Sequence, residues 1–174
     1  MPIAYIHGHK SHYDPNGIKV KTLQKIDDVI PVDYNSTESY SSCMSKLRGI
    51  IVKDICNMKL VGTSLGGFYA AHLAAEFDLP AVLINPAVSP FESLNEPSYK
   101  GKDITTLKFK YRPLVLLDMG DEHFDSTVTA KKLSHFEIIK YAGGNHRFAH
   151  MNEAAEEIKK YFNMIDTFYM CEDD

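Results

Sequence analysis

The sequence predicts an α/β protein built on a mostly parallel sheet of about six strands. Short apolar runs of strand length alternate along the chain with helical patterns, which is typical of βα units. Several runs are almost continuously apolar, as expected for strands that are covered on both faces. A chain of 174 residues with 44% hydrophobic content is the size of one domain, which we expect to span residues 1–174.

Six apolar runs have the length of strands. Turn-forming residues or helical patterns separate each run from the next, so each run is read as one strand of the sheet. The expected strands are Ile3–His7, Val29–Asp33, Lys59–Thr63, Ala81–Asn85, Leu114–Met119 and Glu137–Tyr141.

Two stretches carry a clear helical repeat, and a third is ambiguous. The first predicts a helix between the second and third strands despite Gly49; its apolar positions are Tyr40, Met44, Leu47, Ile50, Ile51 and Ile55. The second predicts a closing helix over 150–165, followed by a frayed acidic tail at 166–174; its apolar positions are Met151, Ala154, Ala155, Ile158, Phe162 and Ile165. Residues 17–26 fit either a strand or a helix.

The connection from Pro86 to Pro113 is unusually long. It holds Pro90 and Pro97 as well and has only a weak helical pattern. Connections of this length are often binding loops, and this one follows a strand at the sheet edge where α/β proteins bind ligands.

Charge and composition exclude several classes of function. A net charge of −4 with scattered basic residues gives no reason to expect a nucleic acid or an anionic membrane as a partner. No apolar run approaches the length of a membrane span, and the N-terminus lacks a signal-peptide pattern. Cys43, Cys56 and Cys171 are odd in number and lack metal-site spacing, so free thiols in a reducing cytoplasm are expected.

The most informative motif is Gly62-Thr63-Ser64-Leu65-Gly66, which has the pattern G-x-S-x-G. An apolar run precedes it and an alanine-rich helical stretch follows it. In such a strand-to-helix turn, glycines two residues before and after the serine prevent a collision and leave the hydroxyl exposed. Ser64 is therefore the candidate nucleophile, with an ordinary serine in a tight turn as the alternative.

A serine hydroxyl needs a neighbouring base to take its proton. Of the eight histidines, His146 has the most suitable place in the sequence, because it follows Gly143-Gly144-Asn145 between the last strand and the last helix. A histidine on such a turn can reach across to the serine.

An acid that orients the histidine should follow the preceding strand. Asp118 lies within the strand and is the weakest candidate, whereas Asp121 comes directly after Gly120 at the strand's end. Asp125 precedes a helix expected over Ser126–Leu133 and could be its N-cap. We favour Asp121, with Asp125 as the alternative.

Two backbone N–H groups are the candidate donors to the oxyanion that forms during acyl transfer. One belongs to Leu65, directly after Ser64. The other belongs to His9, because Gly8 lets the loop after the first strand turn towards the substrate. A metal site formed by His7, His9 and His12 is a weaker alternative, since no carboxylate–histidine continuation follows and Asp14 stands alone.

These residues resemble those of the α/β-hydrolases, in which nucleophile, acid and base occur in the chain order of Ser64, Asp121 and His146. More narrowly, the chain resembles the small bacterial YqiA-like esterases. Stretches between residues 3 and 148 carry this resemblance: Tyr5–Gly8, Val61–Tyr69, Leu79–Val88, Gly120–Glu122 and Gly143–Phe148.

The resemblance implies a compact three-layer αβα sandwich without a large lid and hydrolysis of carboxylic esters or thioesters. Residues 9–40 and 91–112 depart from the family pattern, so no substrate preference is carried over. We expect a serine hydrolase that needs no cofactor and acts on a small acyl ester or thioester through an acyl-enzyme on Ser64. The alternative is a catalytically idle α/β-hydrolase fold that serves as a binding or scaffold protein.

Overall fold

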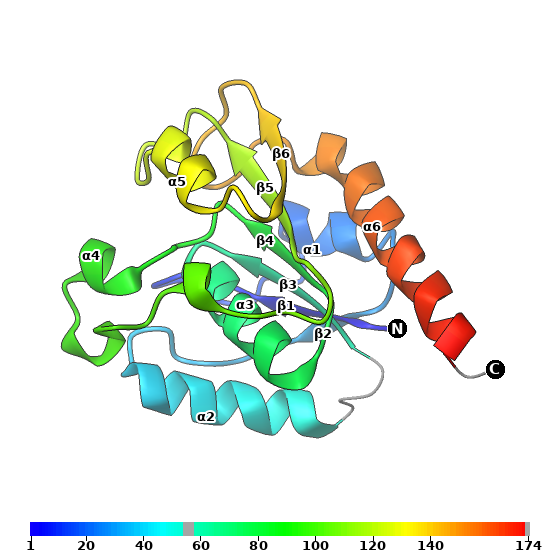
Figure 1. The fold of residues 1–174 in the computed structure, drawn as a ribbon, viewed down its shortest axis with the longest axis horizontal. Coiled ribbons are helices and arrows are strands. Elements are labelled where there is room, and N and C mark those ends of the chain that lie inside the picture. The colour runs from blue at the N-terminus through cyan, green and yellow to red at the C-terminus, as the bar shows by residue number, and fades with distance from the viewer. Residues whose placement is uncertain (54–57, 173–174) are drawn as a thin grey trace.

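The computed structural model describes residues 1–53 and 58–172, with the backbone alone for 168–172, so Ile55 and Cys56 lie outside the described residues. Its centre is a six-stranded sheet in the order β2-β1-β3-β4-β5-β6, in which every neighbouring pair is parallel (Figure 1). The predicted α/β class and parallel sheet are confirmed. The strands are β1 Ile3–Ile6, β2 Val29–Pro31, β3 Lys59–Thr63, β4 Ala81–Ile84, β5 Leu114–Asp118 and β6 Glu137–Tyr141.

Helices occupy most of the connections between strands. The α-helices are α1 Ile18–Leu23, α2 Tyr40–Ile51, α3 Leu65–Phe77, α4 Pro90–Leu94, α5 Ser126–Lys132 and α6 Met151–Glu172. Short 3₁₀ turns lie at Pro97–Tyr99 and Ile104–Thr106. The closing helix expected over 150–165 continues to Glu172 through most of the segment expected as a tail, since no glycine or proline interrupts it.

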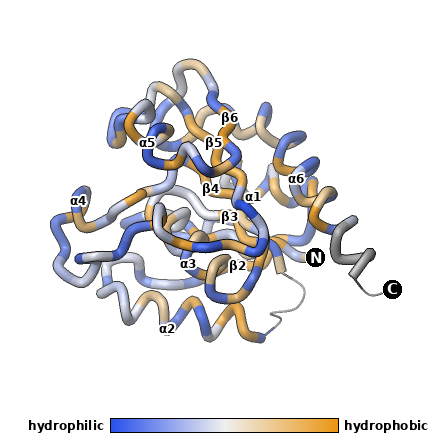
Figure 2. Tube along the Cα trace, in the orientation of Figure 1, coloured by the Kyte–Doolittle hydropathy of each residue, from blue (hydrophilic) through white to orange (hydrophobic). Residues whose placement is uncertain are grey.

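Alternate residues of each strand face opposite layers of helices. Ala4 and Ile6 of β1 pack in a cluster with α2, α3 and α5, whereas Ile3 and Tyr5 pack with α1 and α6. Figure 1 shows the helices arranged around the central sheet, and Figure 2 shows the hydrophobic residues concentrated in the strands. The sheet is buried on both faces, which explains the almost continuous apolar runs.

The ambiguous segment at 17–26 forms helix α1. Val20 and Leu23 are buried in the cluster that includes α6, while Ile18 is half exposed. The buried apolar positions are therefore three residues apart, and packing against α6 selects the helical interpretation of the pattern.

The topology places a crevice between β1 and β3. After β1 the chain turns to α1 on one face of the sheet, and after β3 it turns to α3 on the other. Ligands of open α/β sheets bind at the carboxyl ends of two such strands. The loop that begins at His7 and the turn at Ser64 therefore meet at the expected edge.

Helix α3 contains a partly buried histidine, His72, that makes stability depend on pH. The Nε2 atom of His72 is buried without a hydrogen-bond partner among the described residues, and its ring centroid lies 4.5 Å from that of Phe68. Burial, and secondarily the charge of Lys102, lowers the pKa of His72 from 6.5 to about 4. The folded protein therefore excludes a proton that the unfolded chain binds.

We expect the free energy of unfolding to fall as the pH drops from about 6.5 to about 4. Between these two pKa values His72 is protonated in the unfolded chain but neutral in the folded protein. The resulting loss in the free energy of unfolding reaches roughly 3 kcal/mol near the folded pKa. Urea unfolding at pH 7 and pH 4.5 measures the change. In His72→Leu this part of the pH dependence should disappear; an unchanged slope would assign it to other groups.

Candidate active site

Ser64 lies in a strained turn between β3 and α3. Its backbone has φ 55° and ψ −120°, a region that non-glycine residues rarely occupy. Hydrogen bonds hold this conformation: the Ser64 N–H donates to the Ile84 carbonyl at 3.0 Å, and its carbonyl accepts from the N–H groups of Gly67 and Ala87, each at 3.0 Å. The conformation is fixed by the neighbouring strand β4 as well as by α3.

The two glycines of the motif are required by close backbone contacts. A Cβ atom on Gly62 would collide with the carbonyl oxygen of Gly66, and one on Gly66 would collide with the carbonyl oxygen of Ile6. The turn can therefore form only with glycine at both positions, which is the reason for the G-x-S-x-G spacing.

The structure brings Ser64, His146 and Asp121 together from three separate connections. The Nε2 atom of His146 lies 3.0 Å from Oγ of Ser64. On the other side of the ring, Nδ1 lies 2.8 Å from Oδ2 and 3.0 Å from Oδ1 of Asp121. The side chain of His146 is 18% exposed, while that of Asp121 is 1% exposed. His146 is thus partly open to solvent, whereas the Asp121 carboxylate is buried.

Hydrogen bonds keep the Asp121 carboxyl ionised. Burial alone would raise its pKa, but hydrogen bonds from His146 and from the backbone N–H groups of Phe124 and His123 outweigh burial and lower the pKa. An ionised carboxylate can only accept, so Nδ1 of His146 must carry the proton. The Nε2 atom of the neutral ring is then free to accept the proton of Ser64.

The two other acid candidates have different roles. Asp125 is the N-cap of α5 and accepts from the backbone N–H groups of Thr127 and Val128 at 2.9 and 3.0 Å, as predicted. Asp118 is the last residue of β5 and is fully buried. Its Oδ1 lies 2.6 Å from Nδ1 of His150, away from Ser64.

Asp118 and Asn85 hold the turn that carries His146, a role that sequence reasoning missed. Asp118 accepts hydrogen bonds from the N–H groups of Asn145 and Ala149, at 3.1 and 2.6 Å. The side-chain amide of Asn85 donates to the carbonyls of Asn145 and His146 and accepts from the N–H of Asp118. The only signal in the sequence is that each polar residue ends an otherwise apolar run.

We expect Asp118→Asn to destabilise the protein and to slow turnover. The amide has one oxygen, with an NH₂ group in place of the second, so a buried N–H or the ring donor of His150 loses its acceptor, at a cost of about 1–3 kcal/mol. Thermal unfolding and the turnover number are measured together. Asp78→Asn is the matched control, because Asp78 is exposed in a left-handed position that asparagine accepts. Equal melting temperatures for the two variants would contradict the assigned role.

The loop after β1 approaches Ser64 closely. A Cβ atom on Gly8 would lie 3.3 Å from Cβ of Ser64, so glycine permits the approach. The ring of His9 is anchored at 3.0 Å to the carbonyl of Ser36, whose hydroxyl accepts from the N–H of Lys10 at 2.8 Å. Among residues 1–53 and 58–172, no acceptor is found for the N–H of His9 or of Leu65.

The three histidines considered as metal ligands do not form a ligand set. Nδ1 of His7 lies 3.0 Å from the carbonyl of Gly8, and the ring of His9 turns to Ser36. Within the described residues, no group of three or more histidine, cysteine or acidic side chains could hold a metal ion.

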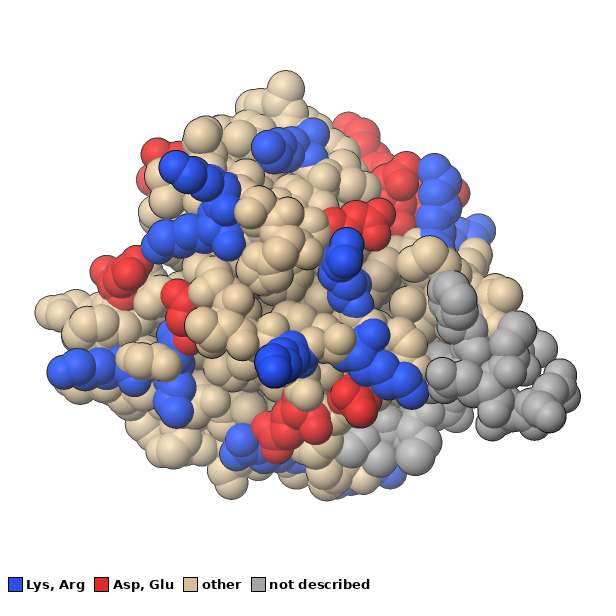
Figure 3. All heavy atoms as spheres, viewed as in Figure 1, with Lys and Arg blue, Asp and Glu red and all other residues tan. Residues whose placement is uncertain are grey.

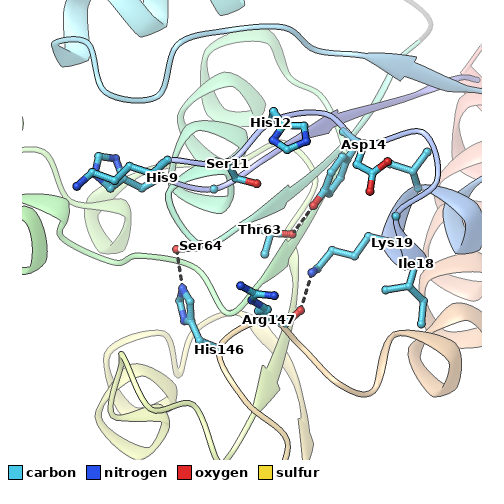
Figure 4. A pocket seen from close by; sticks show the side chains of 15 residues that line it. His9, Ser11, His12, Asp14, Ile18, Lys19, Thr63, Ser64, His146 and Arg147 are labelled. Carbon is cyan, nitrogen blue, oxygen red and sulfur yellow. Dashed lines mark hydrogen bonds between the residues drawn. The ribbon is translucent and has the colours of Figure 1, made fainter.

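One pocket contains Ser64 and His146, and a second is lined by residues that neighbour Asp121 in the sequence. The larger, of about 540 Å³, is lined by Ser64, His146 and residues of the loop after β1 and helix α1 (Figure 4). The smaller, of about 250 Å³, is lined partly by Pro86, Val88 and Ser89 of the long connection and by His123 and Phe124. The rings of His123 and Phe124 also contact the ring of His146 edge to face.

Comparison with known proteins places the chain in a family. A model described as "Uncharacterised protein family (UPF0227)" matches residues 2–100. The chain belongs to the UPF0227 family. A UPF0227 protein of Citrobacter koseri is 29% identical over 175 residues, which cover 91% of this chain and 97% of the relative. The resemblance to YqiA-like proteins inferred from the sequence is confirmed.

Solved structures show that this UPF0227 protein has the α/β-hydrolase fold. Est1E from Butyrivibrio proteoclasticus has a TM-score of 0.79 at 13% identity, covering 94% of this chain and 87% of that chain. Monoacylglycerol lipase from Paleococcus ferrophilus has a TM-score of 0.70 at 15% identity, covering 92% and 93%. Among the helices of the described residues, none is long and apolar enough to cross a bilayer.

Proposed function

We propose that this protein is a serine hydrolase that cleaves carboxylic esters or thioesters through an acyl-enzyme on Ser64. One observation carries the proposal: His146 lies between Ser64 and Asp121, at 3.0 Å from the hydroxyl and 2.8 Å from the carboxylate. This is the geometry that activates a serine by general base catalysis. The α/β-hydrolase fold, which a monoacylglycerol lipase shares, supports the same class of chemistry.

The proposed reaction has two halves. Oγ of Ser64 attacks the acyl carbon while Nε2 of His146 takes the hydroxyl proton, and Asp121 stabilises the imidazolium. The N–H groups of Leu65 and His9 stabilise the oxyanion of the tetrahedral intermediate, and His146 then protonates the departing alcohol or thiol. Water, deprotonated by His146, then attacks the acyl carbon. The bond from that carbon to Oγ of Ser64 breaks, His146 returns the proton to Oγ, and the acid is released. No cofactor takes part.

Three further features support the proposal. Ser64 has a strained conformation and lines the larger pocket. The pKa of Asp121 is lowered, so its charge is available to the imidazolium. The N–H groups assigned to the oxyanion have no acceptor within the described chain. A cytoplasmic location is part of the proposal and agrees with the free, buried thiol of Cys43.

Labelling with a fluorophosphonate tests the proposal directly, because this probe reacts with an activated serine. We expect one label per chain, on the peptide that contains Ser64. We also expect the unlabelled protein to hydrolyse short-chain nitrophenyl esters or acyl thioesters, and labelling to abolish this hydrolysis. Heat-denatured protein serves as the control for nonspecific labelling. An unlabelled, folded protein that hydrolyses neither class would favour a binding or scaffold role instead.

A further inference from the structure

The larger pocket has a charge opposite to that of the chain as a whole. Its lining contains Lys10, Lys19 and Arg147 but only one carboxylate, Asp14. The chain carries a net charge of −4, and the face in Figure 3 shows acidic and basic side chains interspersed. An excess of positive charge is therefore concentrated next to Ser64 and His146.

Lys19 brings its ammonium group into this pocket from α1. The Nζ atom donates to the backbone carbonyl of Arg147 at 2.5 Å, as Figure 4 shows. Burial, and secondarily the charge of Arg147, lowers the pKa of Lys19, while Asp118 opposes the change. In the described part of the chain no carboxylate lies within 4.0 Å of Nζ. An ammonium has three donors, so two remain for a ligand.

Arg147 follows His146 directly and is therefore held by the same turn. Its backbone N–H donates to the side chain of Asn145 at 3.0 Å, and its carbonyl receives Lys19. The guanidinium lines the pocket between His146 and Lys19 (Figure 4), and no ion pair is found for it within the described residues. Two neighbouring cations without a counter-charge repel each other, and an anion between them would relieve that repulsion.

We infer that the substrate carries an oxyanion group, a carboxylate or a phosphate, which Lys19 and Arg147 bind in this pocket beside the ester bond. The inference rests on the proposed serine hydrolase. A guanidinium matches the planar oxygens of a carboxylate or phosphate, and an ammonium adds a point charge. The few apolar residues of the lining, Ile18 and Val20 among them, offer little surface for a long acyl chain.

Pairs of esters that differ in the presence of one anionic group test the inference. In the acyl arm, 4-nitrophenyl hemisuccinate is compared with 4-nitrophenyl butyrate. In the alcohol arm, 4-acetoxybenzoate is compared with its methyl ester, and 2-acetoxyethyl phosphate with 2-acetoxyethanol. We expect kcat/KM to favour the charged member of at least one pair by about tenfold to a hundredfold, the size of a charge-assisted hydrogen bond. The preference should shrink as salt is raised from about 0.01 to 0.5 M.

Variants show whether the two cations cause the preference. Arg147→Gln and Lys19→Met should each reduce the charged-to-neutral ratio of kcat/KM about tenfold or more, with melting temperatures measured alongside. Lys131→Gln removes the same charge from α5, outside the pocket, and should leave the ratio unchanged. A wild-type protein without charge preference in any pair, or variants that keep the full ratio, would overturn the inference and leave the proposed hydrolase intact.

Binding without turnover separates the two proposals. Two proteins are titrated calorimetrically with succinate and with inorganic phosphate: the Ser64→Ala variant and the double variant that also carries Arg147→Gln. If the anions bind and Arg147→Gln weakens the binding about tenfold, the anion site is supported. This holds even when the wild-type protein hydrolyses no ester, and in that case only the proposed function fails. Absence of binding together with absence of charge preference rejects the site.

Discussion

Ser64→Ala is expected to lower ester turnover by about a millionfold while the protein stays folded. Loss of the nucleophile removes the acyl-enzyme route, and removal of a catalytic serine in such enzymes has an effect of this order. The hydroxyl makes its hydrogen bond to His146, whereas the backbone contacts that fix the turn are unaffected. Initial rates on a nitrophenyl ester and thermal unfolding measure the two quantities.

Ser45→Ala is the matched control for this substitution, because Ser45 is exposed on α2, away from the pocket. It should retain full turnover and, since alanine favours helices, at least the original stability. Retention of a tenth of the wild-type rate by folded Ser64→Ala would show that Ser64 is not the nucleophile.

Asp121→Asn is expected to reduce the turnover number by about ten-thousandfold. The amide donates towards Nδ1 of His146, which stabilises the tautomer whose Nε2 carries the proton and cannot take one from Ser64. The carboxylate accepts from His146 at 2.8 Å and from the N–H of His123 at 2.8 Å, so the substitution changes the partner of the ring at the site itself. Rates are measured at saturating ester, with the fold checked by circular dichroism.

Asp125→Ala provides the contrast within the same connection. Loss of the cap of α5 should lower the free energy of unfolding by about 0.5–2 kcal/mol and leave turnover largely unchanged. The two variants thus separate a catalytic effect from a structural one. A large loss of turnover in Asp125→Ala, with little loss in Asp121→Asn, would show that Asp125 and not Asp121 is the acid that orients His146.

Much of the fold could be predicted because buried parallel strands are apolar on both faces. Strands β3 and β6 have the predicted bounds, Lys59–Thr63 and Glu137–Tyr141. Strands β1, β4 and β5 each end one residue before the predicted ends at His7, Asn85 and Met119. These residues directly follow their strands at the carboxyl edge of the sheet, where the chain leaves the ladder to form the candidate site. Local hydrophobicity does not mark that departure.

A long apolar repeat predicts a helix more clearly than a short one. The apolar repeat of α6 predicts a helix clearly. The observed helix is longer than predicted, because no glycine or proline follows residue 165. In contrast, α1 has six residues, and only its packing against α6 separates a helix from a strand. The connection 86–113 also forms the short helix α4 and two 3₁₀ turns, whose arrangement depends on tertiary contacts such as that between the hydroxyls of Tyr99 and Tyr69, 2.6 Å apart.

The sequence by itself determined the α/β class, the strained turn at Ser64 and the candidate residues His146 and Asp121. These features depend on short-range patterns: apolar runs, the spacing of glycines around a serine, and the position of a residue after a strand. Only the tertiary structure decided how Asp118 and Asn85 hold the His146 turn and how Lys19 and Arg147 combine in one pocket. Lys19 and Arg147 are 128 positions apart, so the charge they share arises only when the sheet brings its carboxyl-end loops together.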